Sequence, residues 1–349
     1  MSGKGCLVYV IILVVVGLLL VLSSGLLANL GISSILPEPV LPTIVLPAES
    51  LTGTTEILGF KTGFTNTMLT TLMADIVLVA LAYFGTRKLR AGDDSAMIPS
   101  GLQNFLEMLV EGLYNLAEGI LGTRTRKVFW LGATIFLFVL VANWMELIPG
   151  YDSIGWLEPP HEAGMAAYDR TELGPIGMLK GPAIEPAETA HGEEAEGEDH
   201  EAAGWVLVPF FRAANTDLNV TIMLAIISVV MTQVFSIQAL GLGGYLGKFI
   251  QTKRMGEGNP MGILDTFVGA LEAIAEFAKI ISFAFRLFGN VFAGAVLLFV
   301  MGFLIPFLFP GVMIFYGLEL FVGAIQALVF MMLTFVFISA ATTAHGEGH

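Results

Sequence analysis

A permanent cation lies in the middle of a long apolar stretch of this chain. Arg286 stands between Phe285 and Leu287, within the run 280–294. A guanidinium keeps its charge in a protein, and placing it at the centre of a bilayer costs at least about 2.5–3.5 kcal/mol. Such a residue is expected to face a water-filled cavity or a carboxylate, and it is therefore the first candidate functional residue.

Other polar side chains share the helical face of Arg286. At 100° per residue, a helix through this stretch places them within roughly 80° of one another. The set is Glu272, Glu276, Lys279, Arg286 and Asn290, with Ser282 at its edge. The next apolar stretch carries Glu319 and Gln326, seven residues apart and hence on one face. Carboxylates at membrane depth mark proton paths, although the same groups could also serve as buried polar contacts between helices.

The order of these residues along the chain indicates two dead-end passages. If the stretch that holds Arg286 runs outward, Glu272 and Glu276 lie toward the inside and Glu319 toward the outside. The fixed charge of Arg286 would separate the two passages and would attract an ionised carboxylate. The chain has no obvious group of its own that could carry protons from one passage to the other, so we expect a mobile carboxylate on a partner subunit.

The composition is that of an integral membrane protein. Of 349 residues, 55% are apolar and 13% are charged, and the mean hydropathy is +0.80, which is typical of that class. The net charge of −14 is concentrated in residues 185–201, which hold eight acidic side chains and are expected to form a solvated loop. Nothing is basic enough to indicate nucleic acid, and the single cysteine, Cys6, cannot form an intrachain disulfide.

No metal or cofactor is expected. The histidines lie in polar segments without the spacing of metal ligands, and we expect all of them to be solvated: His161, His191, His200, His345 and His349. The chain also has no glycine-rich phosphate loop followed by Lys-Ser/Thr, so no nucleotide binding is expected.

Six apolar stretches predict an all-α integral membrane protein with about five core membrane helices. They are 6–30, 68–84, 128–148, 218–240, 261–308 and 312–341. The last two are longer than one crossing needs, since about 45 helical residues would extend ~68 Å against ~30 Å of hydrocarbon. We expect two long C-terminal helices that are tilted, unless the longer one is bent or folded back as a hairpin.

Three segments organise the chain. Residues 1–31 are either a signal-like segment or a retained membrane anchor, and residues 32–66 are expected to be an extracytoplasmic linker. Residues 67–349 form the membrane domain, with an acidic external loop at 150–204. Residues 101–121 predict an amphipathic helix at the membrane interface. Ten Lys and Arg residues would lie inside and four outside, which predicts a cytoplasmic C-terminus and an external acidic loop.

The segment around Arg286 resembles a family signature. Residues 285–294, Phe-Arg-Leu-Phe-Gly-Asn-Val-Phe-Ala-Gly, are similar to the signature of the a subunit of F-type ATP synthases. Segments 143–149, 217–221 and 326–334 also resemble parts of that family. The resemblance covers roughly residues 60–342.

The resemblance implies a non-catalytic stator subunit in a bacterial plasma membrane. Its partners would be a ring of carboxylate-bearing c subunits, b-type peripheral stalk subunits and membrane lipid. Arg286 would face the ring and separate two half-channels. The outer half-channel would be lined by Asn290, Gln326 and Glu319, and the inner one by Glu272 with Ser282 nearby. Further candidate lining residues are Glu276, Lys279, Glu146, Asp217 and Asn219.

One titratable position departs from the family pattern. Some bacterial members carry histidine where this chain has Glu319, together with a glutamate where this chain has Ala295. Glu319 is therefore expected to be the main outer carboxylate.

Two other functions remain as alternatives. An independent ion-coupled transporter would be favoured by internal repeats, and none relates the two halves of this chain. An intramembrane hydrolase would need a nucleophile–base pair or a metal motif such as His-Glu-x-x-His, and neither is present.

Overall fold

The computed structural model describes residues 48–51, 55–57, 60–90, 99–148, 150–159, 167–173, 176–184, 204–249, 261–304 and 309–343. The first apolar stretch with Cys6, the acidic run 185–201 and all five histidines lie outside these residues.

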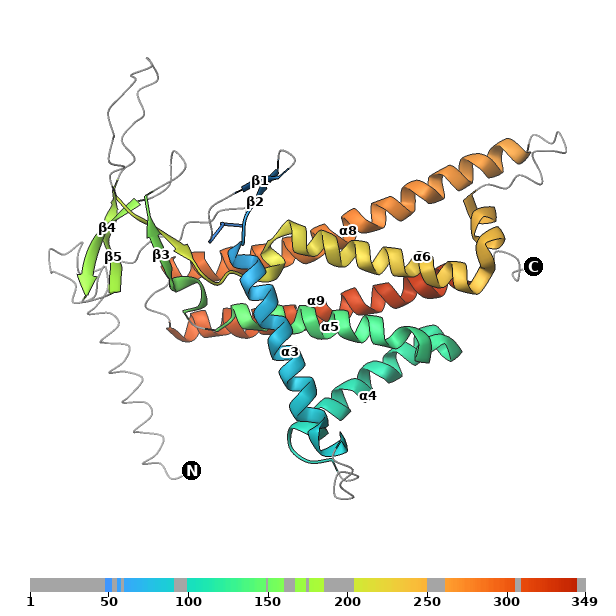
Figure 1. Ribbon diagram of the computed structural model, residues 1–349, viewed down its shortest axis with the longest axis horizontal. Helices are drawn as coiled ribbons and strands as arrows, with labels where there is room; N and C mark the ends of the chain where they lie inside the picture. Colours follow the sequence, from blue (N-terminus) through green and yellow to red (C-terminus); the bar gives the residue numbers. More distant parts are fainter. Residues whose placement is uncertain are drawn as a thin grey trace, which may run out of the picture. The chain divides into compact units, whose positions relative to one another are not determined.

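Long helices dominate the described chain (Figure 1). They are α3 (Asn66–Arg90), α4 (Leu102–Leu121), α5 (Thr125–Glu146), α6 (Leu218–Phe249), α8 (Met261–Leu304) and α9 (Phe309–Thr342). Within the described residues, five spans are long and apolar enough to cross a membrane: Asn66–Leu89, Leu102–Glu146, Leu218–Gly247, Phe267–Met301 and Met313–Thr342. The predicted class, a helical multi-pass membrane protein, is confirmed.

The described residues form two compact units. The first comprises the described parts of Met1–Asn66, Pro149–Arg212 and Ala293–Glu319. It contains three antiparallel strand pairs. They are β1 (Thr55–Ile57) with β2 (Phe60–Thr62), β3 (Gly155–Glu158) with β6 (Val206–Pro209), and β4 (Ala167–Leu173) with β5 (Ile176–Ile184). Strands therefore occur in the segments expected to be a linker and an external loop.

The β3–β6 pair is closely packed. Gly155 lies so near the backbone of Val208 that a side chain on residue 155 would have no room. Val208 itself is buried. The rings of Trp156 and Phe210 meet edge to face, with centroids 5.0 Å apart, an arrangement that aromatic quadrupoles favour. A second contact links Tyr168 and Trp205, whose backbone groups exchange two hydrogen bonds of 2.9 Å.

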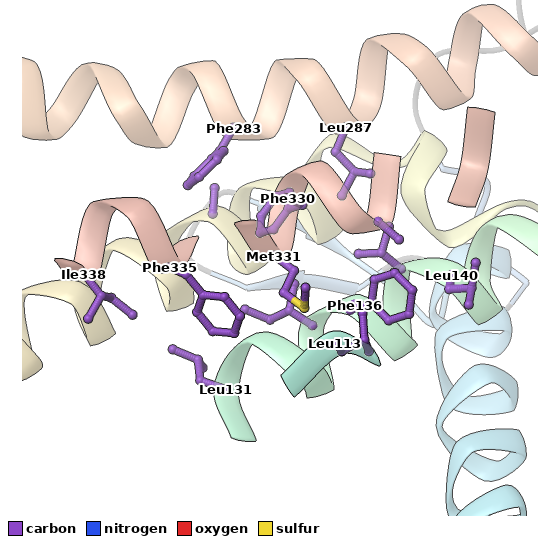
Figure 2. Close-up of a cluster of buried hydrophobic side chains, with 14 of the residues drawn as sticks. Leu113, Leu131, Phe136, Leu140, Phe283, Leu287, Phe330, Met331, Phe335 and Ile338 are labelled. Atoms are coloured by element: carbon purple, nitrogen blue, oxygen red, sulfur yellow. The ribbon is translucent and has the colours of Figure 1, made fainter. Parts of the chain in front are cut away.

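The second unit is a helical core made by the described parts of Thr67–Ile148, Ala213–Phe292 and Leu320–His349. Figure 2 shows its buried centre, where Phe283 of α8 stacks on Phe330 of α9 with ring centroids 4.7 Å apart. Phe335 of α9 lies against Gly132 of α5, where a Cβ atom would collide with its ring. Small residues of this kind allow membrane helices to approach closely.

Buried hydroxyl groups join α6 to α9 in the same unit. The Ser228 and Thr334 side chains lie 2.9 Å apart, and the Ser236 hydroxyl donates to the carbonyl oxygen of Ala341 at 2.7 Å. At the end of α9, the Arg124 guanidinium donates to the hydroxyl and carbonyl oxygens of Thr342 at 3.0 and 3.3 Å. These bonds satisfy polar groups that would be costly to leave unpaired in an apolar setting.

Glycines with positive φ set the ends of two helical segments. Gly122 (φ 56°) ends α4 and donates to the carbonyl oxygen of Glu118, and a left-handed residue at this position is usually glycine. Gly241 (φ 72°, ψ 164°) interrupts α6. The predicted stretch 218–240 therefore ends at a kink, and a short helical segment follows it.

α8 is one continuous helix over its described length. Its 44 residues extend about 66 Å at 1.5 Å per residue. No hairpin occurs between Met261 and Leu304, so that alternative for the fifth apolar stretch is excluded. The expectation of an amphipathic helix at 101–121 matches α4. The other predicted helix ends lie within about four residues of the observed ends, except that α3 continues to Arg90 and not 84, and α6 to Phe249 and not 240.

Candidate functional site

Arg286 is exposed on α8, in the middle of an otherwise largely apolar stretch. Ile274, Phe277, Ile281 and Phe285 are also exposed on this helix, but at 100° per residue they lie roughly 100–180° around it from Arg286. Within the described part of the chain, no residue makes a hydrogen bond or an ion pair with the Arg286 guanidinium. A permanent charge is thus exposed within a helix that is apolar enough to cross a membrane, where a cation is costly unless it is matched by water or an anion.

Asn290 and Gln326 connect α8 to α9. The Asn290 amide nitrogen donates to the Gln326 amide oxygen at 2.7 Å. The Gln326 side chain is 5% exposed, and its Nε2 atom has no hydrogen-bond partner among the described residues. The structure brings these two predicted residues together, and it leaves a buried donor beside them.

Glu319 contacts the backbone of the helix that precedes it. Its carboxylate lies against Gly294, at the point that a Cβ atom on residue 294 would occupy. Both residues belong to the first unit. The absence of a side chain at Gly294 therefore gives the carboxylate its space.

Glu276 and Lys279 hold each other one turn apart on α8. The Lys279 ammonium donates to Glu276 Oε1 at 2.8 Å, and the Gln233 amide of α6 donates to Glu276 Oε2 at 2.8 Å. Lys279 also lies 4.8 Å from the ring centroid of Phe337 on α9. These contacts tie α8 to both neighbouring helices and partly neutralise the second cation of the predicted stripe.

The other two predicted residues of α8 differ in exposure. Glu272 is half-buried, one turn before Glu276, and Ser282 is exposed, one turn before Arg286. The predicted stripe thus divides into a buried part around Glu276 and an exposed part around Arg286.

A second polar group lies where α5 and α9 meet the 3₁₀ turn Ala214–Thr216 that precedes α6. The Asn215 amide donates to Asn143 Oδ1 at 2.7 Å, and the Asn143 amide donates to the Gly323 carbonyl oxygen at 3.3 Å. The Trp144 indole donates to the Leu320 carbonyl oxygen at 3.1 Å. These contacts fix the positions of the three segments through groups that would otherwise be unsatisfied.

Asp217 has a clear structural role. Its Oδ1 atom accepts from the backbone N–H of Asn219 at 2.9 Å, as an N-cap does at the start of α6. Its Oδ2 atom accepts from the Thr67 hydroxyl at 2.8 Å. The Asn219 side chain is exposed, and Glu146 is half-buried at the end of α5.

Sequence reasoning missed some of these residues. Gln233 and Asn143 are polar side chains within apolar stretches, so the rule that singled out Arg286 could have found them. Gly294 and Asn215 gave no such signal, because their importance depends on which helix lies opposite.

The fold and these contacts define a multi-pass helical membrane protein that holds charged and amide side chains among apolar helices. The family model described as ATP synthase A chain matches residues 67–339. The chain is 28% identical over 282 residues to an ATP synthase subunit a of Moorella thermoacetica, covering 81% of this chain and 92% of that protein. It is 27% identical over 288 residues to the subunit a of Mycobacterium tuberculosis, covering 82% and 90%.

A third relative agrees with these two. The ATP synthase subunit a of Helicobacter hepaticus is 26% identical over 278 residues, covering 79% of this chain and 89% of that protein. Because the family model covers most of the chain, this protein belongs to the ATP synthase A chain family. The resemblance found in the sequence around Arg286 is confirmed.

Proposed function

We propose that this protein is the proton-translocating stator subunit of an ATP synthase membrane sector. The observation that carries the proposal is Arg286, an exposed cation of α8 that makes no ion pair or hydrogen bond with any described residue, in a chain of this family. The free-energy cost of a charged side chain inside a membrane is offset where the charge meets a functional partner. The partner we infer is the ionised carboxylate of a rotating ring of c subunits.

Arg286 acts by separating two half-channels that do not meet. Asn290, Gln326 and Glu319 line the outer passage, and Glu272 with Ser282 lines the inner one. A ring carboxylate that approaches Arg286 loses its proton, because a nearby cation favours the charged form of a carboxyl group. A proton can then cross only by travelling on the ring.

The subunit itself is non-catalytic. Each proton that crosses 100 mV supplies about 2.3 kcal/mol, and the rest of the complex uses this energy for ATP synthesis. Among the site residues, the amide pair Asn290–Gln326 supports a polar lining, since it offers a buried donor next to an exposed amide. We place the protein in a bacterial plasma membrane with its C-terminus in the cytoplasm, and b-type stalk subunits would hold it against rotation.

Substitution of Arg286 tests the proposal. Membranes that contain the complex with Arg286→Ala should lose ATP-driven proton pumping while the ring still co-purifies with this subunit. Arg126→Ala is a matched control, because Arg126 is an exposed arginine of α5 and should leave pumping unchanged. Near-normal pumping by the Arg286→Ala complex would refute the proposal.

The same purification separates this function from that of an independent transporter. The purified subunit without its ring should move no ions in liposomes. Ion flux driven by the isolated chain would instead favour a secondary transporter.

A further inference from the structure

A second charged residue lies at membrane depth, on α3. Asp75 is the only Asp, Glu, Lys or Arg between Asn66 and Thr86. It follows the first residue of α3 by nine positions, about 14 Å along the helix at 1.5 Å per residue. In a hydrocarbon layer of ~30 Å, that distance places it near the middle.

Asp75 faces away from the other residues that the structure describes. Its side chain is exposed, and no residue in the described ranges makes a hydrogen bond or ion pair with it. The opposite side of α3 supplies the internal contacts, through the buried Thr67, Thr70 and Ala74. The exposed carboxylate therefore has no role in the packing of α3 against the described part of its own chain.

Asp75 stands within an apolar stripe. Met68, Leu72, Ile76, Val79 and Tyr83 are all exposed. At 100° per residue they fall with Asp75 inside roughly a 100° arc of the helix surface. This width is what one packing helix covers.

The stripe is hollowed beside the carboxylate. A depression of about 420 Å³ is lined by Asp75, Ile76, Val79, Ala80 and Tyr83. This open space lies beside Asp75 and leaves room for a side chain from a neighbouring helix.

We propose that this stripe of α3 binds a transmembrane helix of another subunit, and that this helix presents a lysine or arginine at the depth of Asp75. Lipid chains cannot solvate a carboxylate, and acidic residues inside membranes pair with other polar groups almost without exception. A basic side chain matches both the charge and the hollow. The inference is independent of the role of Arg286, since it concerns assembly and not ion movement.

Photo-crosslinking in the intact complex tests the docking surface. In a Cys6→Ser background, Val79→Cys and Val77→Cys are each labelled with a thiol-reactive benzophenone. Both valines are exposed, at 69% and 37%, but Val77 lies about 200° around the helix from Asp75. We expect an adduct with another subunit from position 79 and none from position 77.

The adduct identifies the partner, and Asp75 then tests the ion pair. The linked subunit should carry Lys or Arg within its membrane segment. Asp75→Leu should cause loss of that subunit from the purified complex, and Asp75→Asn should weaken its retention. Exchanging the charges, with Asp75→Lys and an aspartate in place of the partner's basic residue, should restore the adduct.

Several outcomes would overturn the proposal. They include equal adducts from both positions, an adduct only with residues 6–30 of this chain or with a second copy, and a partner helix without a basic residue. The proposal would also be overturned if the complex with Asp75→Leu retained the partner subunit as well as the wild-type complex does. If Asp75→Asn prevents the chain itself from accumulating in the membrane, Asp75 serves its own fold and the proposal is wrong. Loss of pumping by Arg286→Ala would be unaffected by any of these results.

Discussion

The Glu319 carboxylate occupies the space that a side chain on Gly294 would need. We expect Gly294→Ala to push this carboxylate aside and to slow proton uptake from the outer face. Assembly should be retained, because the displaced group is the end of a flexible side chain and not backbone. Proton pumping in inverted membranes, measured over a series of external pH values, checks this result.

Two variants calibrate the Gly294 measurement. Glu319→Gln removes the carboxylate and should slow proton uptake at least as much as Gly294→Ala. Gly317→Ala is the control, since a Cβ atom there would contact nothing within 4 Å. Equal rates for Gly294→Ala and Gly317→Ala would show that the position of the carboxylate does not matter.

The hydrogen bond between Asn290 and Gln326 predicts energetic coupling. We expect Asn290→Leu and Gln326→Leu each to slow ATP-driven pumping, because each leaves the other amide without its partner. The double variant should lose less than the sum of the two effects, with a coupling of about 0.5–3 kcal/mol in the activation free energy. Strict additivity of the logarithms of the rates would contradict the coupling.

Because Glu276 and Lys279 form an ion pair, we expect replacing both residues to impair stability and pumping less than replacing Glu276 alone. Glu276→Gln keeps an acceptor for the Gln233 amide but leaves Lys279 uncompensated. We expect this variant to lower the stability of the subunit by about 2 kcal/mol and to slow pumping, since a second bare cation would stand on the helix of Arg286. Glu276→Gln with Lys279→Gln should recover most of both losses.

Thermal unfolding and pumping of the same preparations decide the matter. A double variant as impaired as Glu276→Gln would show that the Glu276 carboxylate is needed for itself, as expected of a channel-lining group.

The stability of the segment around Asp152, which lies outside the membrane helices, is expected to depend on pH. Burial raises the pKa of Asp152 from 3.8 to about 6, although the charge of Arg212 opposes this shift. Between these values the folded segment binds more protons than the unfolded one, so its stability falls as pH rises from about 4 to about 6. Hydrogen exchange of the β3 amides, corrected for intrinsic rates, checks this expectation. Above pH 6 these amides should be more protected in the Asp152→Asn variant than in the wild type, and below pH 4 the two proteins should be equally protected. Identical profiles at all pH values would refute the shift.

The helices could be predicted from the sequence because a membrane restricts the chain to long apolar runs. The segments now seen as α5 and α9 were visible in this way, as was the polar stripe of α8. The β1–β2 pair could not be found, since these strands are three residues each and show no clear alternation.

The candidate site was only partly predictable for a different reason. Helical periodicity places Asn290 and Arg286 on one face, but the partner of each depends on how α8 and α9 are aligned along their axes. The contact of Glu319 with Gly294 is set by that alignment. Asp75 is a different case: it obeyed the same rule as Arg286 and could have been singled out from the sequence.

The pairing of Gly155–Glu158 with Val206–Pro209 brings the two ends of the intervening residues side by side. When the two ends of a loop are held together, added residues cost little free energy, since the entropic cost of closing the loop grows only with the logarithm of its length. The β3–β6 pair therefore allows insertions between residues 158 and 206 to be gained or lost during evolution while the two strands keep their register.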